Sequence, residues 1–176
     1  MSLRFGILTV SDRSSHGERE DASGPALVEM IREQGWQVVE QDIVPDERPA
    51  LERLLKRWAD SDRVDVILTT GGTGFSPRDV TPEATAAVVD RAAPGLAEAM
   101  RAASLRVTPH AMLSRAAAGI RGRTLIVNLP GSPKGARENL NVVLPVLAHA
   151  VQLLREQPDA EAGHHIQGRQ TPSEGV

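Results

Sequence analysis

Residues 64–83 read VDVILTTGGTGFSPRDVTPE, and this stretch predicts the fold around it. Residues 66–70 (VILTT) begin as a short, branched apolar run of the kind that forms a buried central strand. Residues 71–74 then carry three glycines, so the backbone there can adopt positive φ and come close to a ligand. Residues 81–83 (TPE) predict the start of a helix with Thr81 as its N-cap. A strand, a glycine loop and a helix in this order predict a phosphate or nucleotide site.

The composition excludes several classes of protein. A net charge of −3 and a pI near 6.0 give no general attraction to nucleic acid or to an anionic membrane. Aromatic residues make up only 2%, too few to provide stacking platforms for bases. The chain has no cysteine, which excludes disulfides, thiolate metal sites and a cysteine nucleophile. Without a long apolar run or a signal-peptide pattern, we expect a cytoplasmic protein with no nucleic-acid or membrane partner.

Apolar runs and helical stripes alternate along the chain. Strands are predicted at residues 5–10, 36–44, 66–70 and 123–129, and helices at about 25–33, 48–60, 81–91, 95–105 and 133–155. This alternation predicts an α/β fold, a three-layer sandwich with a mostly parallel central sheet flanked by helices. Pro145 is expected to kink or break the last helix. We expect one domain at residues 1–156 and a polar, disordered C-terminal tail at residues 157–176.

One segment remains ambiguous from its pattern alone. Residues 112–120 fit a helix, a strand or a loop equally well. A short β-hairpin around residues 108–120 is one solution, and it would place an antiparallel pairing at the edge of the sheet.

Four segments with candidate site residues follow predicted strands. They are residues 11–13, Asp46, residues 71–79 and residues 130–134. Because parallel strands end at one edge of a sheet, these segments should converge there. Together they offer loop amides for phosphate and carboxylates for a divalent cation, a combination that suits Mg²⁺ held by one or two carboxylates and substrate phosphates. Two alternatives stay open: a solvated turn after the first strand, and Asp46 as the cap of the next helix.

Familiar catalytic signatures are missing. The chain has no GxxxxGK[ST] phosphate loop, no GxGxxG dinucleotide fingerprint and no GxSxG hydrolase elbow. No histidine is paired with a recognisable catalytic partner, and His149 stands in an apolar helical stretch that is typical of a core position.

Eight short motifs, taken together, resemble the molybdopterin adenylyltransferase family, which includes MogA- and MoaB-type proteins and the G domains of gephyrin and the plant Cnx proteins. They occur in the order of that family and cover about residues 3–155. The motifs are TVSDR (9–13), DASG (21–24), VPDE (44–47), TTGGTG (69–74), PRDVTPEAT (77–85), PGLAEAMR (94–101), VTPHAMLSR (107–115) and NLPGSPKG (128–135).

The resemblance implies a trimeric cytosolic enzyme that binds molybdopterin and Mg-ATP. It would transfer AMP to the terminal phosphate of molybdopterin, release pyrophosphate and supply a molybdenum-insertion enzyme downstream. Asp46 and Asp79 match the catalytic, metal-binding aspartates of the family. The resemblance further assigns the nucleotide and phosphates to Thr70, Gly71, Gly72, Thr73, Gly74, Pro130, Gly131 and Ser132. It assigns the molybdopterin pocket to Ser11, Asp12, Arg13, Ser114, Arg115 and Lys134.

Other functions compete with this hypothesis. A non-catalytic molybdopterin-binding or carrier protein would share the same fold. A scaffolding role, as in gephyrin, and an unrelated phosphate-binding enzyme fit the motifs less well. The sequence does not decide whether the pathway uses molybdenum or tungsten, or whether the protein assembles as a trimer or a hexamer.

Overall fold

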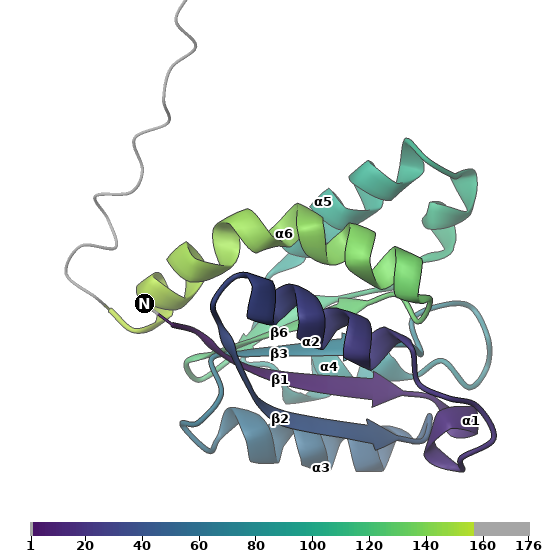
Figure 1. Ribbon diagram of the computed structural model, residues 1–176, viewed down its shortest axis with the longest axis horizontal. Helices are drawn as coiled ribbons and strands as arrows, with labels where there is room; N and C mark the ends of the chain where they lie inside the picture. Colours follow the sequence, from purple (N-terminus) through teal and green to yellow (C-terminus); the bar gives the residue numbers. More distant parts are fainter. Residues whose placement is uncertain (1, 157–176) are drawn as a thin grey trace, which may run out of the picture.

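The computed structural model describes residues 2–156 (Figure 1). The strands are β1 (Arg4–Val10), β2 (Gln37–Val44), β3 (Val66–Thr70), β4 (Arg91–Ala92), β5 (Ala118–Arg121) and β6 (Thr124–Leu129). The helices are α1 (Asp12–Ser15), α2 (Ser23–Glu33), α3 (Arg48–Ala59), α4 (Thr81–Val88), α5 (Pro94–Leu105), the 3₁₀ helix η1 (Pro109–Leu113) and α6 (Pro133–Leu154). The predicted tail at 157–176 lies outside the described residues, so the division into a domain and a tail stays a prediction.

Six strands form one sheet in the order β2-β1-β3-β6-β5-β4. The first four are parallel, β5 is antiparallel to β6, and β4 is antiparallel to β5. The predicted α/β fold with a mostly parallel sheet is therefore confirmed. In register, Thr70 of β3 lies between Thr9 of β1 and Leu129 of β6, so these three strands end at the same level.

Helices cover both faces of the sheet, as Figure 1 shows, with α2, α5 and α6 on one face and α3 and α4 on the other. Each face of the sheet has its own apolar core. Alternate side chains of a strand belong to different cores because successive residues of a strand point to opposite faces. In β1, Phe5 and Ile7 pack beneath α2 and α6, whereas Leu8 and Val10 pack against α3. All residues of β3 and β6 are buried, which explains the continuous apolar runs at the centre of each strand.

The antiparallel pairing at the sheet edge exists, but the residues that form it differ from the prediction. The hairpin joins β5 to β6 and turns at Gly122, whose φ of 54° suits glycine. Residues 109–113 instead form η1, capped by the Thr108 hydroxyl. The prediction of a hairpin around residues 108–120 was therefore wrong in its position.

The predicted cap at Thr81 was wrong, and of the two roles left open for Asp46 the structure does not show the helix cap. Thr81 is the first residue of α4, and its hydroxyl donates to the Gly71 carbonyl at 2.9 Å instead of capping the helix. Glu47 occupies the N-cap position of α3 without a side-chain bond, and the Asp46 carboxylate turns to the loop after β1. Both side chains had tertiary partners that a local pattern does not contain.

Two helices differ in extent from their predictions. Helix α4 ends at Val88, three residues early, because Val89 is extended and leads into β4. Helix α6 continues through Pro145 without a break. A proline removes the hydrogen bond to the carbonyl four residues earlier, and here that residue, Asn141, is exposed. None of the helices between residues 2 and 156 is long and apolar enough to cross a membrane.

Asn128 is a buried polar link between β6 and its neighbours. Its amide nitrogen donates to the hydroxyls of Thr69 at 3.0 Å and Thr85 at 2.8 Å, and its amide oxygen accepts from Ala117 N–H at 3.2 Å. The residue therefore joins β3, α4 and the segment before β5 at the level where the strands end.

We predict that Asn128→Ala lowers the free energy of unfolding by about 2–4 kcal/mol. The change leaves the half-buried Ala117 N–H without its acceptor, removes the donor to the buried Thr69 and Thr85 hydroxyls, and opens a cavity. Urea denaturation of the two proteins measures this difference. A loss below about 1 kcal/mol would show that the neighbouring hydroxyls re-pair without cost.

Candidate functional site

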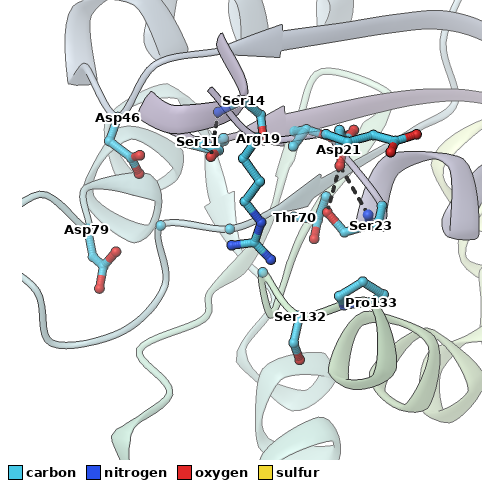
Figure 2. Close-up of a pocket in the computed structure, with 17 residues that line it drawn as sticks. Ser11, Ser14, Arg19, Asp21, Ser23, Asp46, Thr70, Asp79, Ser132 and Pro133 are labelled. Carbon is cyan, nitrogen blue, oxygen red and sulfur yellow. Dashed lines mark hydrogen bonds between the residues drawn. The ribbon is translucent and has the colours of Figure 1, made fainter. Parts of the chain in front are cut away.

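A polar cavity of about 290 Å³ opens at the carboxyl ends of β1 and β3. The strand order reverses at this point, since β1 is followed by β2 on one side and by β3 on the other. Open α/β sheets place their ligand sites at such switch points. Figure 2 shows the side chains that meet there from the loops after β1, β2, β3 and β6. The four predicted segments therefore do converge, although only some of their residues line the cavity.

Two glycines form the floor of this cavity. Gly71 has a φ of 104°, and a β-carbon on it would lie 2.2 Å from the Val10 carbonyl oxygen. Gly72 has a φ of 63°, and a β-carbon there would lie 2.9 Å from a carboxylate oxygen of Asp46. A side chain at either position would fill the cavity or displace its walls, so the bare backbone is what a ligand meets.

Asp12 and Asp46 hold each other through reciprocal hydrogen bonds. The Asp12 N–H donates to Asp46 Oδ2, and the Asp46 N–H donates to Asp12 Oδ1, both at 2.9 Å. Arg78, from the loop after β3, binds both oxygens of Asp12 at 2.8 and 2.9 Å. These three residues thus tie together the loops after β1, β2 and β3.

The two carboxyl groups of this pair differ in acidity. The hydrogen bond from Arg78 lowers the pKa of Asp12. Burial raises the pKa of Asp46, as do the charges of Asp12 and Asp79, against the opposing effects of the Asp12 N–H and Arg78. Ionised Asp46 is consequently in an unfavourable environment that a bound cation would relieve.

Asp79 lies on the same side of the cavity as Asp46 (Figure 2). Its Oδ2 accepts the Ser76 N–H at 2.9 Å, and Gly74 allows this because a β-carbon there would lie 2.9 Å from the same oxygen. Among residues 2–156, Oδ1 of Asp79 and Oδ1 of Asp46 receive no hydrogen bond, so each carboxylate keeps one oxygen for a ligand.

This donor set fits Mg²⁺. The ion prefers oxygen ligands and usually combines one or two carboxylates with water and substrate phosphates. Asp46 and Asp79 supply two carboxylates on one cavity. Within the described part of the chain, no cluster of three or more histidine or acidic residues offers a complete protein cage for a metal.

The remaining wall of the cavity comes from β3, β6 and the segment between α1 and α2. Thr70 donates its hydroxyl to the Pro130 carbonyl at 2.7 Å, and Ser132 caps α6 by accepting the Gly135 N–H. Asp21 accepts four hydrogen bonds, from Thr9, Ser23 and Gly24, and so fixes the start of α2. Arg19 extends into the space between these groups (Figure 2).

A second cavity, of about 500 Å³, lies on the other side of the Ser132 loop. Ser132 lines both cavities, which makes them neighbours. The second one is bounded by α5, η1 and the first turns of α6, and it combines apolar groups such as Val107 and Leu113 with polar ones such as Lys134. A ligand with a flat ring system and a charged end suits this mixture.

Arg115 is hydrogen-bonded to the backbone of the glycine loop and of the segment that follows it. Its Nε donates to the Gly74 carbonyl at 2.7 Å, its Nη2 donates to the Asp79 carbonyl at 2.6 Å, and its Nη1 pairs with Glu83. Its own N–H donates to the Thr73 carbonyl at 2.9 Å. One side chain therefore holds the segment from Thr73 to Glu83, which carries Asp79.

The site residues predicted from the sequence fall into three groups. The first cavity is lined by Ser11, Asp46, Thr70, Gly71, Gly72, Asp79, Gly131 and Ser132. The second is lined by Thr73, Gly74, Ser114, Pro130, Ser132 and Lys134. Asp12, Arg13 and Arg115 line neither cavity. Their roles toward a ligand stay predictions.

Sequence reasoning assigned no site role to the segment before α2. Arg19, Glu20, Asp21 and Ser23 line the first cavity, and Arg101 and His110 line the second. The sequence could have indicated these residues in one way. The helix after the first strand must begin near the sheet edge where that strand ends, so the segment that leads into the helix borders the same site.

Comparisons with known proteins place the chain in a family. The family model described as a probable molybdopterin-binding domain matches residues 6–149. A molybdopterin adenylyltransferase of Helicobacter pylori is 44% identical over 155 residues, covering 87% of this chain and 88% of its own. Gephyrin of Dictyostelium discoideum is 47% identical over 163 residues, but the alignment covers only 23% of that longer protein. The crystal structure of the molybdopterin biosynthesis enzyme MoaB from Thermus thermophilus superposes with a TM-score of 0.83 at 55% identity, covering 88% of this chain and 98% of the other.

We predict that Asp46→Asn makes the protein more stable at neutral pH. A carboxyl whose pKa is raised by folding destabilises the folded state when ionised, and this cost grows as the pH rises through the raised pKa. Asparagine keeps an oxygen for the Asp12 N–H and carries no charge. Thermal unfolding should show a higher Tm for the variant at pH 7. The difference should shrink as the pH falls through the raised pKa towards 3.8, the ordinary value, and should be absent below it. Equal Tm values at pH 7 would contradict the charge argument.

We predict that Arg115→Lys lowers the free energy of unfolding by about 1–3 kcal/mol, because one ammonium group cannot reproduce the planar fork that reaches two carbonyls and Glu83. Denaturation in urea measures this loss. Arg106→Lys, an exposed change of the same kind at the end of α5, is the control and should alter stability by less than about 0.5 kcal/mol. Equal effects of the two changes would refute the conclusion that the Arg115 guanidinium holds the segment from Thr73 to Glu83.

Proposed function

This chain belongs to the family of molybdopterin-binding domains, and on that premise we propose that it is a molybdopterin adenylyltransferase of molybdenum cofactor biosynthesis. It joins AMP from ATP to the terminal phosphate of molybdopterin. An oxygen of that phosphate attacks the α-phosphorus of ATP, the new P–O bond forms, and the bond to pyrophosphate breaks. The substrate supplies the nucleophile, so the protein needs none of its own.

The main obstacle to this reaction is repulsion between two anionic substrates. Catalysis of phosphoryl and nucleotidyl transfer therefore depends on positioning and on neutralising charge. The floor of the polar cavity presents bare backbone at Gly71 and Gly72. The Gly71 N–H is already bound to the Leu129 carbonyl, so the Gly72 N–H is the one that can approach a phosphate oxygen. The uncharged hydroxyls of Thr70 and Ser132 flank that floor without adding negative charge.

Asp46 and Asp79 are proposed as the catalytic residues, and they would hold Mg²⁺ through their free oxygens. When bound, Mg²⁺ supplies positive charge that neutralises the phosphates. The chain fixes both carboxylates in advance, Asp46 through the Asp12 N–H and Asp79 through the Ser76 N–H. The single observation that carries the proposal is that these two carboxylates face one cavity whose floor is a glycine loop.

The second cavity supports a site for the other substrate. Its mixed apolar and polar lining suits the pterin, and Lys134 and Ser114 in its wall were predicted to contact molybdopterin. Because Ser132 lines both cavities, substrates held in the two would meet at the Ser132 loop. We propose that the nucleotide phosphates occupy the polar cavity and the pterin occupies the larger one.

The proposal extends to the cellular location of the protein, its oligomeric state and its downstream partner. We propose a cytoplasmic homotrimer that passes adenylyl-molybdopterin to a molybdenum-insertion enzyme. A carrier that binds molybdopterin without turnover is the alternative, and two carboxylates each with a free oxygen argue for turnover instead.

We predict that Asp79→Asn lowers the rate of adenylyl-molybdopterin formation about 100-fold or more, because the amide removes the charge and keeps the shape. The assay follows radiolabelled AMP incorporation with Mg-ATP, while equilibrium dialysis follows molybdopterin binding, which should change little. Asp42→Asn, an exposed change on β2, is the matched control and should keep full activity.

Two outcomes would contradict the proposal in different ways. Full turnover by Asp79→Asn would refute the role of this carboxylate. Molybdopterin binding by the wild-type protein without any adenylylated product would identify a carrier.

A further inference from the structure

The polar cavity has an uneven charge distribution. Four acidic residues line it, Glu20, Asp21, Asp46 and Asp79, against a single basic one, Arg19. A polyphosphate that enters this cavity meets a net negative wall. Mg²⁺ at Asp46 and Asp79 would correct this at one side, but the opposite side, next to Ser132, depends on the charge of Arg19.

Arg19 is free to bind a ligand. Within residues 2–156 its guanidinium forms no hydrogen bond or ion pair, although four carboxylates line the same cavity. Figure 2 shows the side chain reaching down between Thr70 and Ser132 on one side and the two catalytic aspartates on the other. The planar fork of five N–H donors is therefore presented to the centre of the cavity.

The backbone beneath Arg19 is anchored at both ends. The Arg13 carbonyl accepts hydrogen bonds from the N–H groups of Glu18 at 2.8 Å and Arg19 at 3.3 Å. After Arg19, Asp21 fixes the chain through its four hydrogen bonds to Thr9, Ser23 and Gly24. The Asp21 oxygens are thus already used, so this carboxylate does not compete for the guanidinium.

We propose that Arg19 is a phosphate-binding residue of this cavity, which grips a substrate phosphate beside Ser132 from the side opposite Asp46 and Asp79. The inference rests on the proposed function for the identity of the substrates. Arginine is suited to this task because its fork can bind two phosphate oxygens at once. The phosphate can belong to the nucleotide or to molybdopterin, since both carry the same chemical group.

Binding measurements with separate ligands test this role. Arg19→Gln removes the charge and keeps much of the length of the side chain, whereas Arg19→Lys keeps the charge without the fork. One titration uses Mg²⁺ with α,β-methylene-ATP, which is not cleaved at the reacting bond, and the other uses molybdopterin without nucleotide. Arg57→Gln is the matched control, because Arg57 is exposed on α3 and lines neither cavity.

We expect Arg19→Gln to raise the Kd of one of these ligands about tenfold or more, as for a lost hydrogen bond between charged groups. Arg19→Lys should fall between the wild type and Arg19→Gln. Arg57→Gln should leave both Kd values within about twofold. A rise confined to the ATP analogue assigns Arg19 to a nucleotide phosphate, and a rise confined to molybdopterin assigns it to the pterin phosphate.

The proposal is overturned if Arg19→Gln binds both ligands as tightly as Arg57→Gln does. It is also overturned if Arg19→Lys matches the wild type, because a general charge effect would then be sufficient. Failure of the proposed function gives a different result: the wild type would bind the ligands but form no adenylylated product. The binding difference between the Arg19 and Arg57 variants remains readable in that case.

Discussion

The close approach of three parallel strand ends around Gly71 is the constraint on which the rest of the site depends. The Gly71 N–H donates to the Leu129 carbonyl at 3.2 Å, and a β-carbon on Gly71 would collide with the Val10 carbonyl. A β-carbon on Gly131 would lie 3.1 Å from the Gly71 Cα, so the third strand also meets its neighbour backbone to backbone. Because no side chain separates them at these glycines, the loops after β1, β3 and β6 can border one cavity.

The same crowding gathers negative charge. Asp46 and Asp79 face one cavity, and Asp12 adjoins Asp46. The protein offsets this repulsion in part, since Arg78 neutralises Asp12 and backbone N–H groups bind one oxygen each of Asp46 and Asp79. Burial and, to a smaller extent, the charges of Asp12 and Asp79 still raise the pKa of Asp46 and disfavour its ionised form. A site that binds a cation together with polyphosphate gains from carboxylates held in this state, and the cost falls on the stability of the ligand-free protein.

Much of the fold followed from local pattern, and its failures share a cause. Continuous apolar runs identified β1, β3 and β6, and the stripe of Leu51, Leu54, Leu55 and Trp58 identified α3. The errors at helix starts concerned side chains whose partners lie in other loops. Thr81 was predicted to cap a helix and Asp46 was a candidate for the same role, but each binds another loop. Helix-capping rules consider only hydrogen-bond partners that are close in sequence. At the edge of the sheet, segments far apart in the chain pack together and offer these side chains other partners.

The sequence by itself determined the four parallel strands and the five longer helices in their order along the chain, the glycine loop and the chemical types of the candidate residues. These depend on the periodicity and conformational freedom of neighbouring residues. Only the tertiary structure decided which of those residues share a cavity. It separated Arg115, which is hydrogen-bonded to the backbone of the glycine loop, from Ser114, which lines the second cavity, and it brought Arg19 into the polar cavity. The direction of a side chain is fixed by the packing and hydrogen bonds of segments far apart in the chain, and no local pattern carries that information.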